Sequence, residues 1–396
     1  MRKRYLGIFL MMLLLCTLTL SACGDKTPPE HKLTAWLEAA QLDAEETPQE
    51  LYEKALTEDT LIIYSESTRI MDVAKTFMAA YPGLTVSVRD VRANDIVDML
   101  NENFDTENYS CDVVLRNDND GTLSRDFIPR GVIYKYTPYD IAPRMLPGSD
   151  EETLLLMGEG IILIYNDAIY GDMPVTNWWE LTEEQWRGKV ITANPMRSIS
   201  SYAFFSMILN RSDLMEEAYE LWRGKPYESM DGLDAGHYFM RLLVENGLAL
   251  TNSSDEAIEA IGLHGTKNDS LGIIISSKLR MRDIGFNIAP AIGLAPFDGV
   301  YSPNSISIAG GAPNINTAKL FIRWIYGEAD GQGEGYLPYL QSGAWSMRGD
   351  VENAAAVPRA SLDLIDIDRN YSFENRGAFT MFWEELLTNR RNSTGS

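Results

Sequence analysis

The sequence predicts an α/β protein in which mainly parallel sheets are flanked by helices. From Thr60 onward, short apolar strand candidates alternate with amphipathic helix candidates, the order expected for parallel strands joined by crossover helices. The strand candidates are continuous apolar runs, as a sheet covered on both faces requires. A chain of 396 residues is also long enough for two domains with substantial cores.

The first elements follow this alternation in order. Apolar residues recur at three- and four-residue spacing in the helix candidates, and the strand candidates are short and apolar. The expected strands are 61–64, 84–91 and 111–115, and the helical segments that follow them are 69–81, 94–104 and 124–131.

Residues 1–22 have the three parts of an export signal: a basic start, an apolar run too short to span a bilayer, and small residues at the end. The ending Leu20-Ser21-Ala22-Cys23 resembles the lipobox of bacterial lipoproteins, in which the cysteine is acylated. An ordinary cleavage site beside an incidental cysteine is the alternative. An acylated Cys23 would anchor the exported protein without a spanning helix. The anchor would lie at the outer face of the bacterial cytoplasmic membrane, or at the periplasmic side.

The charge of the chain excludes some partners. The formal net charge is −23, and removing the three basic residues of the signal makes it −26. Such a surface repels nucleic acid and anionic head groups. Cys16 lies in the signal and Cys23 in the lipobox, so Cys111 is alone in the mature part and no internal disulfide is expected.

The segment 23–45 is assigned to the lipidated cysteine and a flexible tether, because residues 24–31 are polar and contain a proline pair. Helical patterns nevertheless occur at 33–42 and 48–57. Thr47 and Pro48 form an N-cap and first-turn pair for the second of these.

The chain resembles a known family over most of its mature length. The stretches that carry the resemblance are ALTEDTLIIYSEST, AAYPGLTVSV, CDVVLRND, FIPRGVIYKY, GIILIYNDAI, NWWELTEEQWRGKVITANPMRSISSYAFF, SISIAGGAPNINTAKLFIRWIYG and GAWSMRGDV. In this order they are similar to the extracellular solute-binding proteins of ABC importers, in the branch that binds ferric iron, phosphonate, phosphosugar, thiamine or polyamine.

The resemblance implies a type II periplasmic-binding-protein-like fold, with a ligand cleft between two α/β lobes. The expected first lobe comprises residues 46–157 with 299–335, and the second 158–298 with 336–396. It also implies a monomer that binds a small solute and delivers it to ABC permease subunits. A subunit that presents its ligand to a membrane sensor kinase is the alternative.

Two candidate ligand segments lie in the first lobe. Ser65, Glu66, Ser67 and Thr68 follow strand 61–64, where ligands bind in parallel sheets. The hydroxyls there could cap the next helix or bind an anion together with its amides. After strand 111–115 come Asn117 and Asp118, which either face the cleft or form an Asn/Asp-rich turn. Counting from Asp118 places Leu123 and Pro129 where an EF-hand needs Gly and Glu, so that interpretation fails.

Two further segments belong to the second half. Arg197, Ser198, Ser200 and Ser201 lie between a strand and a helix, and their hydroxyls, amides and guanidinium form the best candidate for an anion site. Asp298 and Tyr301 could line the cleft where the chain returns to the first lobe. Asn252, Ser253 and Ser254 precede another helix and are expected to cap it.

No catalytic or metal site is expected. The three histidines are scattered, without ligand spacing to a cysteine, a glutamate or each other. The serine clusters lack the nucleophile elbow of α/β-hydrolases, and no P-loop or dinucleotide fingerprint follows a strand. Trp178, Trp179 and Trp186 are expected to pack the second lobe. The sequence predicts a binding protein that needs no cofactor.

The preferred ligand is an anion that carries a phosphate or phosphonate. No adjacent pair of tyrosines occurs, which disfavours the ferric ligand because the iron branch usually presents one. Glu66, Asp118, Asp298 and Tyr301 could supply the acidic and aromatic groups that a polyamine needs, so a cationic ligand, including thiamine, stays open as the alternative.

Overall fold

The computed structural model describes residues 33–263, 269–328, 333–353 and 357–394. The signal, Cys23 and most of the expected tether lie outside these residues. The chain divides into two units, residues 1–39 and 40–396. Of the first unit, the structure describes the start of helix α2 (Thr34–Ala40), which falls inside the segment expected to be a tether.

Unit 40–396 contains both lobes. The first lobe has three parallel strands in the order β2 (Val86–Asp90), β1 (Leu61–Ser65) and β3 (Val113–Asn117). Strands β1 and β3 are almost completely buried, in keeping with their apolar sequences. Helices cover them, and Phe77 packs edge-on against Phe321 with ring centroids 5.2 Å apart.

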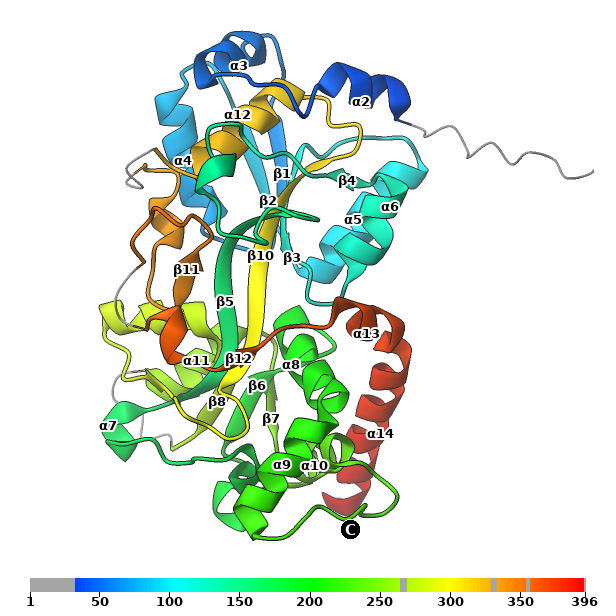
Figure 1. Cartoon of the computed structure of the whole chain (residues 1–396), viewed down its shortest axis with the longest axis vertical. Coiled ribbons are helices and arrows are strands. Elements are labelled where there is room, and N and C mark those ends of the chain that lie inside the picture. The colour runs from blue at the N-terminus through cyan, green and yellow to red at the C-terminus, as the bar shows by residue number, and fades with distance from the viewer. Residues whose placement is uncertain (1–32, 264–268, 329–332, 354–356, 395–396) are drawn as a thin grey trace, which may run out of the picture. The chain divides into compact units, whose positions relative to one another are not determined.

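The second lobe also contains three parallel strands, in the order β8 (Leu271–Ile275), β6 (Val190–Ala193) and β7 (Ala249–Thr251). Two long strands connect the lobes: β5 (Leu154–Tyr165) and β10 (Gly299–Ala309) run antiparallel through the middle of unit 40–396 (Figure 1). Because β10 pairs with β3 and β5 pairs with β8, both parallel sheets join into one continuous sheet. The pair β5–β10 therefore forms the connection between the two lobes.

Short strands extend this sheet at its middle. They are β4 (Ile133–Tyr134) and β12 (Leu364–Ile365) beside β10, with β9 (Ala289–Pro290) and β11 (Ala344–Ser346) beside β5.

The remaining elements are helical. The α-helices are α3 (Pro48–Ala55), α4 (Ile70–Ala80), α5 (Ala93–Asp105), α6 (Ile128–Arg130), α7 (Asp167–Tyr170), α8 (Ile199–Asn210), α9 (Ser212–Arg223), α10 (Ala235–Glu245), α11 (Ser254–Gly262), α12 (Ile315–Ile325), α13 (Arg369–Glu374) and α14 (Arg376–Thr394). A π-helical turn, η1 (Leu123–Phe127), precedes α6, and the 3-10 helices are η2 (Ala142–Arg144), η3 (Trp178–Thr182), η4 (Glu184–Trp186), η5 (Ser276–Ile284), η6 (Leu337–Tyr339) and η7 (Arg359–Ser361).

The expected helix start at Thr47 is confirmed in detail. Thr47 Oγ1 accepts a hydrogen bond from the Glu50 amide at 3.3 Å, and Glu50 Oε2 accepts one from the Thr47 amide at 2.8 Å. This reciprocal capping box, with Pro48 in the first turn, fixes the beginning of α3.

Aromatic residues form the core of the second lobe, as expected for its tryptophans. Trp178 and Trp179 are completely buried, and Trp186 is nearly so. The indole nitrogen of Trp178 donates to Phe297 O at 2.7 Å, and that of Trp179 donates to Met215 O at 2.9 Å. Burial of Trp178 and Trp179 is thus combined with satisfied indole nitrogens, which orient the rings. The indole nitrogen of Trp186 is buried without a hydrogen-bond partner among the described residues.

Residues 336–350, expected to belong to the second lobe, contact both lobes. Arg348 donates to Tyr326 O at 2.7 Å, and the Tyr339 ring lies 4.9 Å from the Arg69 guanidinium. Ser276 Oγ, which follows β8, donates to Gly343 O at 2.5 Å. The segment lies at the crossing because β11 pairs with Met157–Glu159 in the middle of β5. In the described part of the chain, no helix combines the length and apolar character needed to cross a membrane.

Candidate functional site

A pocket of about 300 Å³ lies between the two lobes. Its walls come from the carboxyl ends of the parallel strands in both lobes. The first lobe contributes Glu66–Arg69 after β1, Arg92 and Ala93 after β2, and Asn117 at the end of β3. The second lobe contributes Arg197–Ser200 after β6, Asn252–Asp255 after β7, and Ser277, Lys278 and Arg280 after β8. This is the edge at which α/β sheets bind ligands.

Helices α4, α5, α8 and α11 all begin at the pocket. The first amides of a helix have no partner within it, and the helix dipole makes that end positive. The Ser198 hydroxyl accepts from the Ser201 amide, and the Ser253 hydroxyl accepts from the Glu256 amide. Helix α5 has no side-chain cap. The pocket therefore gathers amide donors from both lobes.

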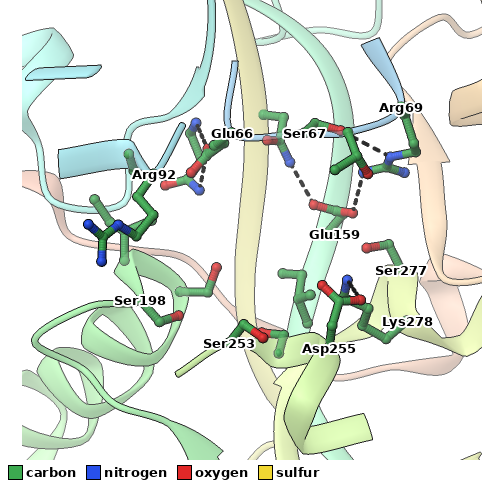
Figure 2. A pocket seen from close by; sticks show the side chains of 18 of the residues that line it. Glu66, Ser67, Arg69, Arg92, Glu159, Ser198, Ser253, Asp255, Ser277 and Lys278 are labelled. Carbon is green, nitrogen blue, oxygen red and sulfur yellow. Dashed lines mark hydrogen bonds and ion pairs between the residues drawn. The ribbon is translucent and has the colours of Figure 1, made fainter. Parts of the chain in front are cut away.

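Arg69, Lys278 and Arg280 form a cationic cluster at one end of the pocket. Arg69 Nη2 donates to Glu159 Oε1 at 3.0 Å, and Lys278 Nζ lies 2.5 Å from Asp255 Oδ1. Figure 2 shows both ion pairs on the same side of the pocket. Burial, followed by repulsion from Arg69, lowers the pKa of Arg280. Burial also lowers the pKa of Lys278.

Two guanidinium nitrogens of this cluster, Arg69 Nη1 and Arg280 Nη1, form no bond to a carboxylate among the described residues. Arg69 Nη1 is buried and has no hydrogen-bond partner among the described residues. Arg280 Nη1 donates to Ser277 O at 2.7 Å, and in the described part of the chain no carboxylate forms an ion pair with it. A buried guanidinium with an unused donor is costly unless another group accepts from it.

Glu66 is a largely buried carboxyl group on the first-lobe wall. Its Oε1 accepts from the amide of Asn117 at 2.6 Å and from Asn117 Nδ2 at 2.8 Å. Burial raises the pKa of Glu66 to about 7, and Glu159 and Asp120 add to the rise, while the Arg116 guanidinium opposes it. Glu66 is thus close to half-protonated near neutral pH.

A family model described as bacterial extracellular solute-binding protein matches residues 72–360. The chain belongs to this family. The family expected from the sequence is thereby confirmed, and the protein is an extracellular solute-binding protein.

Solved structures agree with the family assignment of this solute-binding protein. It superposes on the periplasmic binding protein P5PA with a TM-score of 0.63 at 14% identity, covering 83% of this chain and 100% of that one. For iron-bound HitA from Pseudomonas aeruginosa the TM-score is 0.60 at 16% identity, covering 82% and 99%. For AfuA from Actinobacillus pleuropneumoniae, with fructose-6-phosphate bound, it is 0.59 at 17% identity, covering 84% and 98%. A search of curated proteins gave no match. At these identities the likeness establishes the two-lobed fold alone.

The structure of this solute-binding protein brings together most of the expected ligand residues. Those that line the pocket are Glu66, Ser67, Thr68, Asn117, Arg197, Ser198 and Ser200. Ser65 and Ser201 lie directly behind them and are buried: Ser65 Oγ accepts from the Ser67 amide at 3.0 Å, and Ser201 donates its amide to Ser198.

Like Ser65 and Ser201, the three remaining expected residues lie outside the pocket lining. The Asp118 carboxylate accepts from the amides of Leu123 and Ser124, at 2.7 and 3.1 Å. The Asp298 carboxylate accepts from the amides of Gly293, Leu294 and Asp363. The Tyr301 hydroxyl contacts Met347 Sδ at 3.5 Å. Backbone amides therefore engage both carboxylates. Asp118 binds amides five and six residues further along and also lies 3.5 Å from Arg369 Nε, whereas Asp298 links the turn at Gly293 and Leu294 to the distant Asp363.

Sequence reasoning missed Arg69, Arg92, Glu159, Lys278 and Arg280. Lys278 and Arg280 follow strand β8, so the strand-end rule applied there could have found them. Glu159 lies within the crossing strand β5, and no local pattern distinguishes it. Asn252, Ser253 and Ser254 line the pocket as well, and Ser253 also caps α11, as expected. The described residues contain no cluster of histidine, cysteine and acidic side chains suited to a metal ion.

Proposed function

We propose that this protein captures a small anionic solute, one that carries a phosphoryl or phosphonyl group, and delivers it to the permease of an ABC importer. Its lobes close around the solute, and an acyl group on Cys23 holds it at the membrane. The observation that carries the ligand class is the cluster of Arg69, Lys278 and Arg280, in which the Arg69 Nη1 donor is buried and unused.

A positive cluster of this kind favours an anion for a physical reason. Two guanidinium groups, those of Arg69 and Arg280, repel each other in a partly desolvated pocket. An anionic oxygen between them would accept hydrogen bonds from both and offset the repulsion. Charge-assisted bonds of this type contribute about 1.5–3 kcal/mol each.

Cationic ligands fit the pocket less well because its carboxylates are already engaged. Glu159 accepts from Arg69 and from Asn304 Nδ2, the latter at 2.6 Å. Asp255 is paired with Lys278, and Glu66 Oε1 accepts two bonds from Asn117. A polyamine or thiamine would have to displace the internal cations from these carboxylates. The geometry therefore supports the anion over the cationic alternatives that the sequence left open.

The same cluster suggests how binding drives closure. Arg69 belongs to the first lobe, whereas Lys278 and Arg280 belong to the second. A ligand shifts a conformational equilibrium by its differential affinity for the two states. An anion held by both lobes binds the closed form more tightly than the open one, and the closed form would then be presented to the permease, or to a sensor kinase in the alternative function.

A thermal-shift screen of the mature domain tests the ligand class. The probes are inorganic phosphate, fructose 6-phosphate, 2-aminoethylphosphonate, spermidine, thiamine and ferric citrate. A ligand present at 100 times its dissociation constant adds about 2.7 kcal/mol of stability, which raises the melting temperature measurably. We expect a phosphoryl or phosphonyl compound to stabilise the protein, whereas stabilisation by spermidine, thiamine or ferric citrate alone would refute the proposal.

The matched variants are Arg280→Gln and Arg282→Gln, which remove the same charge two positions apart. Arg280 lines the pocket, whereas Arg282 lies outside the lining and sits 3.7 Å from Asp167. Only Arg280→Gln should abolish the stabilisation by the anion. An equal loss of stabilisation in both variants would mean that the anion responds to the net charge of the protein and not to the pocket.

A further inference from the structure

The pocket presents positive charge at two separate ends. The first anion subsite is the cluster of Arg69, Lys278 and Arg280. The second anion subsite comprises Arg92, Arg197 and the N-termini of α5 and α8. Figure 2 shows Arg92 and Ser198 on one side of the pocket, and Arg69 and Lys278 on the other. A single small anion can occupy only one of these ends.

We infer that the natural ligand carries two anionic groups, one for each subsite. The inference rests on the proposed function and narrows its substrate class from an anion to a bis-anion, such as a small molecule with a phosphoryl group at each end.

The charges of the lining residues divide evenly between the ends. The first subsite has three cations, which face the carboxylates of Glu159 and Asp255. The lining of the second subsite has the cations of Arg92 and Arg197 and, on the same side as Arg92, the carboxyl group of Glu66 (Figure 2). Each end therefore has an excess of one positive charge when all these groups are ionised, in a chain whose net charge is −23.

The partners of the second subsite leave its donors available. Arg92 pairs with Asp95 at 3.0 Å, but both side chains are largely exposed, and exposed pairs contribute little. Arg197 donates to the neutral Asn252 Oδ1 at 2.6 Å, so its charge is not neutralised by that contact.

Helix N-termini serve both ends of the pocket. Helix α4 begins at the first subsite, and α5 and α8 begin at the second. Helix α11 begins between them, since Asn252 accepts a hydrogen bond from Arg197 and Asp255 pairs with Lys278. Asn94 and Ile199, from the first turns of α5 and α8, also line one small cavity beside the pocket, which shows that these two helix ends lie close together. The Ser198 side chain caps only the amide of Ser201, and α5 has no side-chain cap.

The second subsite also gives Glu66 a role. Burial raises the pKa of Glu66 to about 7. The charged groups that act on it are Arg116, Asp120 and Glu159, and Arg92 lies on the same side of the pocket (Figure 2). A second anion nearby favours the neutral form of this carboxyl, which can then donate a hydrogen bond to a ligand oxygen. The pocket volume of about 300 Å³ suits a small organic scaffold between the two anionic groups.

Isothermal titration with matched probes tests this inference. One pair is fructose 1,6-bisphosphate against fructose 6-phosphate, and the other is glutarate against butyrate, which separates phosphoryl from carboxylate chemistry. We expect the bis-anion of one pair to bind about tenfold or more tightly than its mono-anion, because the second subsite adds charge-assisted bonds. Equal affinities within the pair that binds would overturn the inference while leaving the proposed function intact. Binding of none of the four would overturn the inference, whereas the proposed function is decided separately by the thermal-shift screen.

Variants show whether the second subsite is responsible. The double variant Arg92→Gln/Arg197→Gln should lower the ratio of bis-anion to mono-anion affinity to near one. The control is Arg89→Gln, an exposed arginine on β2 that stacks on Tyr64 and lies outside the pocket lining. An unchanged ratio in the double variant would overturn the assignment of the second subsite.

Discussion

Replacing Glu66 by glutamine should remove a pH-dependent loss of stability from this protein. The carboxyl of Glu66 has an ordinary pKa of 4.5 when exposed, and burial raises it to about 7 in the folded state. The folded protein therefore favours the neutral carboxyl, and ionisation favours unfolding. This contribution to stability is complete below pH 4.5, is lost progressively as the pH rises towards 7, and is constant above that.

The magnitude follows from the size of the shift. The pKa values of Glu66 in the unfolded and folded protein differ by roughly 2.5, and each pKa unit corresponds to about 1.4 kcal/mol, so the loss of stability between pH 4.5 and 7.5 is about 3 kcal/mol. Glutamine keeps the shape and cannot ionise. The free energy of unfolding of the wild type, minus that of Glu66→Gln, should therefore fall by about 3 kcal/mol over this range.

Urea unfolding at several pH values between 4.5 and 7.5 measures this difference. Carboxyl groups distant from Glu66 contribute equally to both proteins, so the subtraction isolates Glu66 together with its coupling to Glu159 and Asp120. The control is Glu102→Gln, an exposed carboxylate on α5, which should follow the wild type at every pH. A difference between wild type and Glu66→Gln that stays constant with pH would refute the reasoning.

Three further outcomes are expected. Cys23→Ser should release the protein from membranes, because the acyl group is the proposed anchor; sedimentation of the variant with membranes after a high-salt wash would contradict the lipoprotein hypothesis. Saturating ligand should reduce the radius of gyration in small-angle scattering, and an unchanged value would exclude closure of the lobes. Trp178→Ala should lower the free energy of unfolding by about 3–5 kcal/mol, because it empties a buried site and leaves Phe297 O without its donor. Chemical denaturation checks this value, and a loss below about 1 kcal/mol would show that the core reorganises.

Much of the fold followed from local patterns. The helix expected at 94–104 is observed as α5, and the strand expected at 61–64 as β1, because apolar periodicity records which face of an element is buried. The positions that follow strands could also be recognised. Ser67, Thr68, Ser198 and Ser200 reach the pocket because the carboxyl ends of parallel strands meet at one edge.

The sequence by itself thus determined the class of fold, the family and the strand-end segments that line the pocket. Only the tertiary structure decided which charges act there. Arg69 and Arg280 are more than 200 positions apart in the sequence, and they meet because β5 and β10 cross between the lobes. The same packing gives the carboxylates of Asp118 and Asp298 to nearby backbone amides and brings Glu159 to Arg69. Local periodicity records burial, whereas the balance of charge in a pocket depends on side chains from distant segments, and their distances are set only by the complete fold.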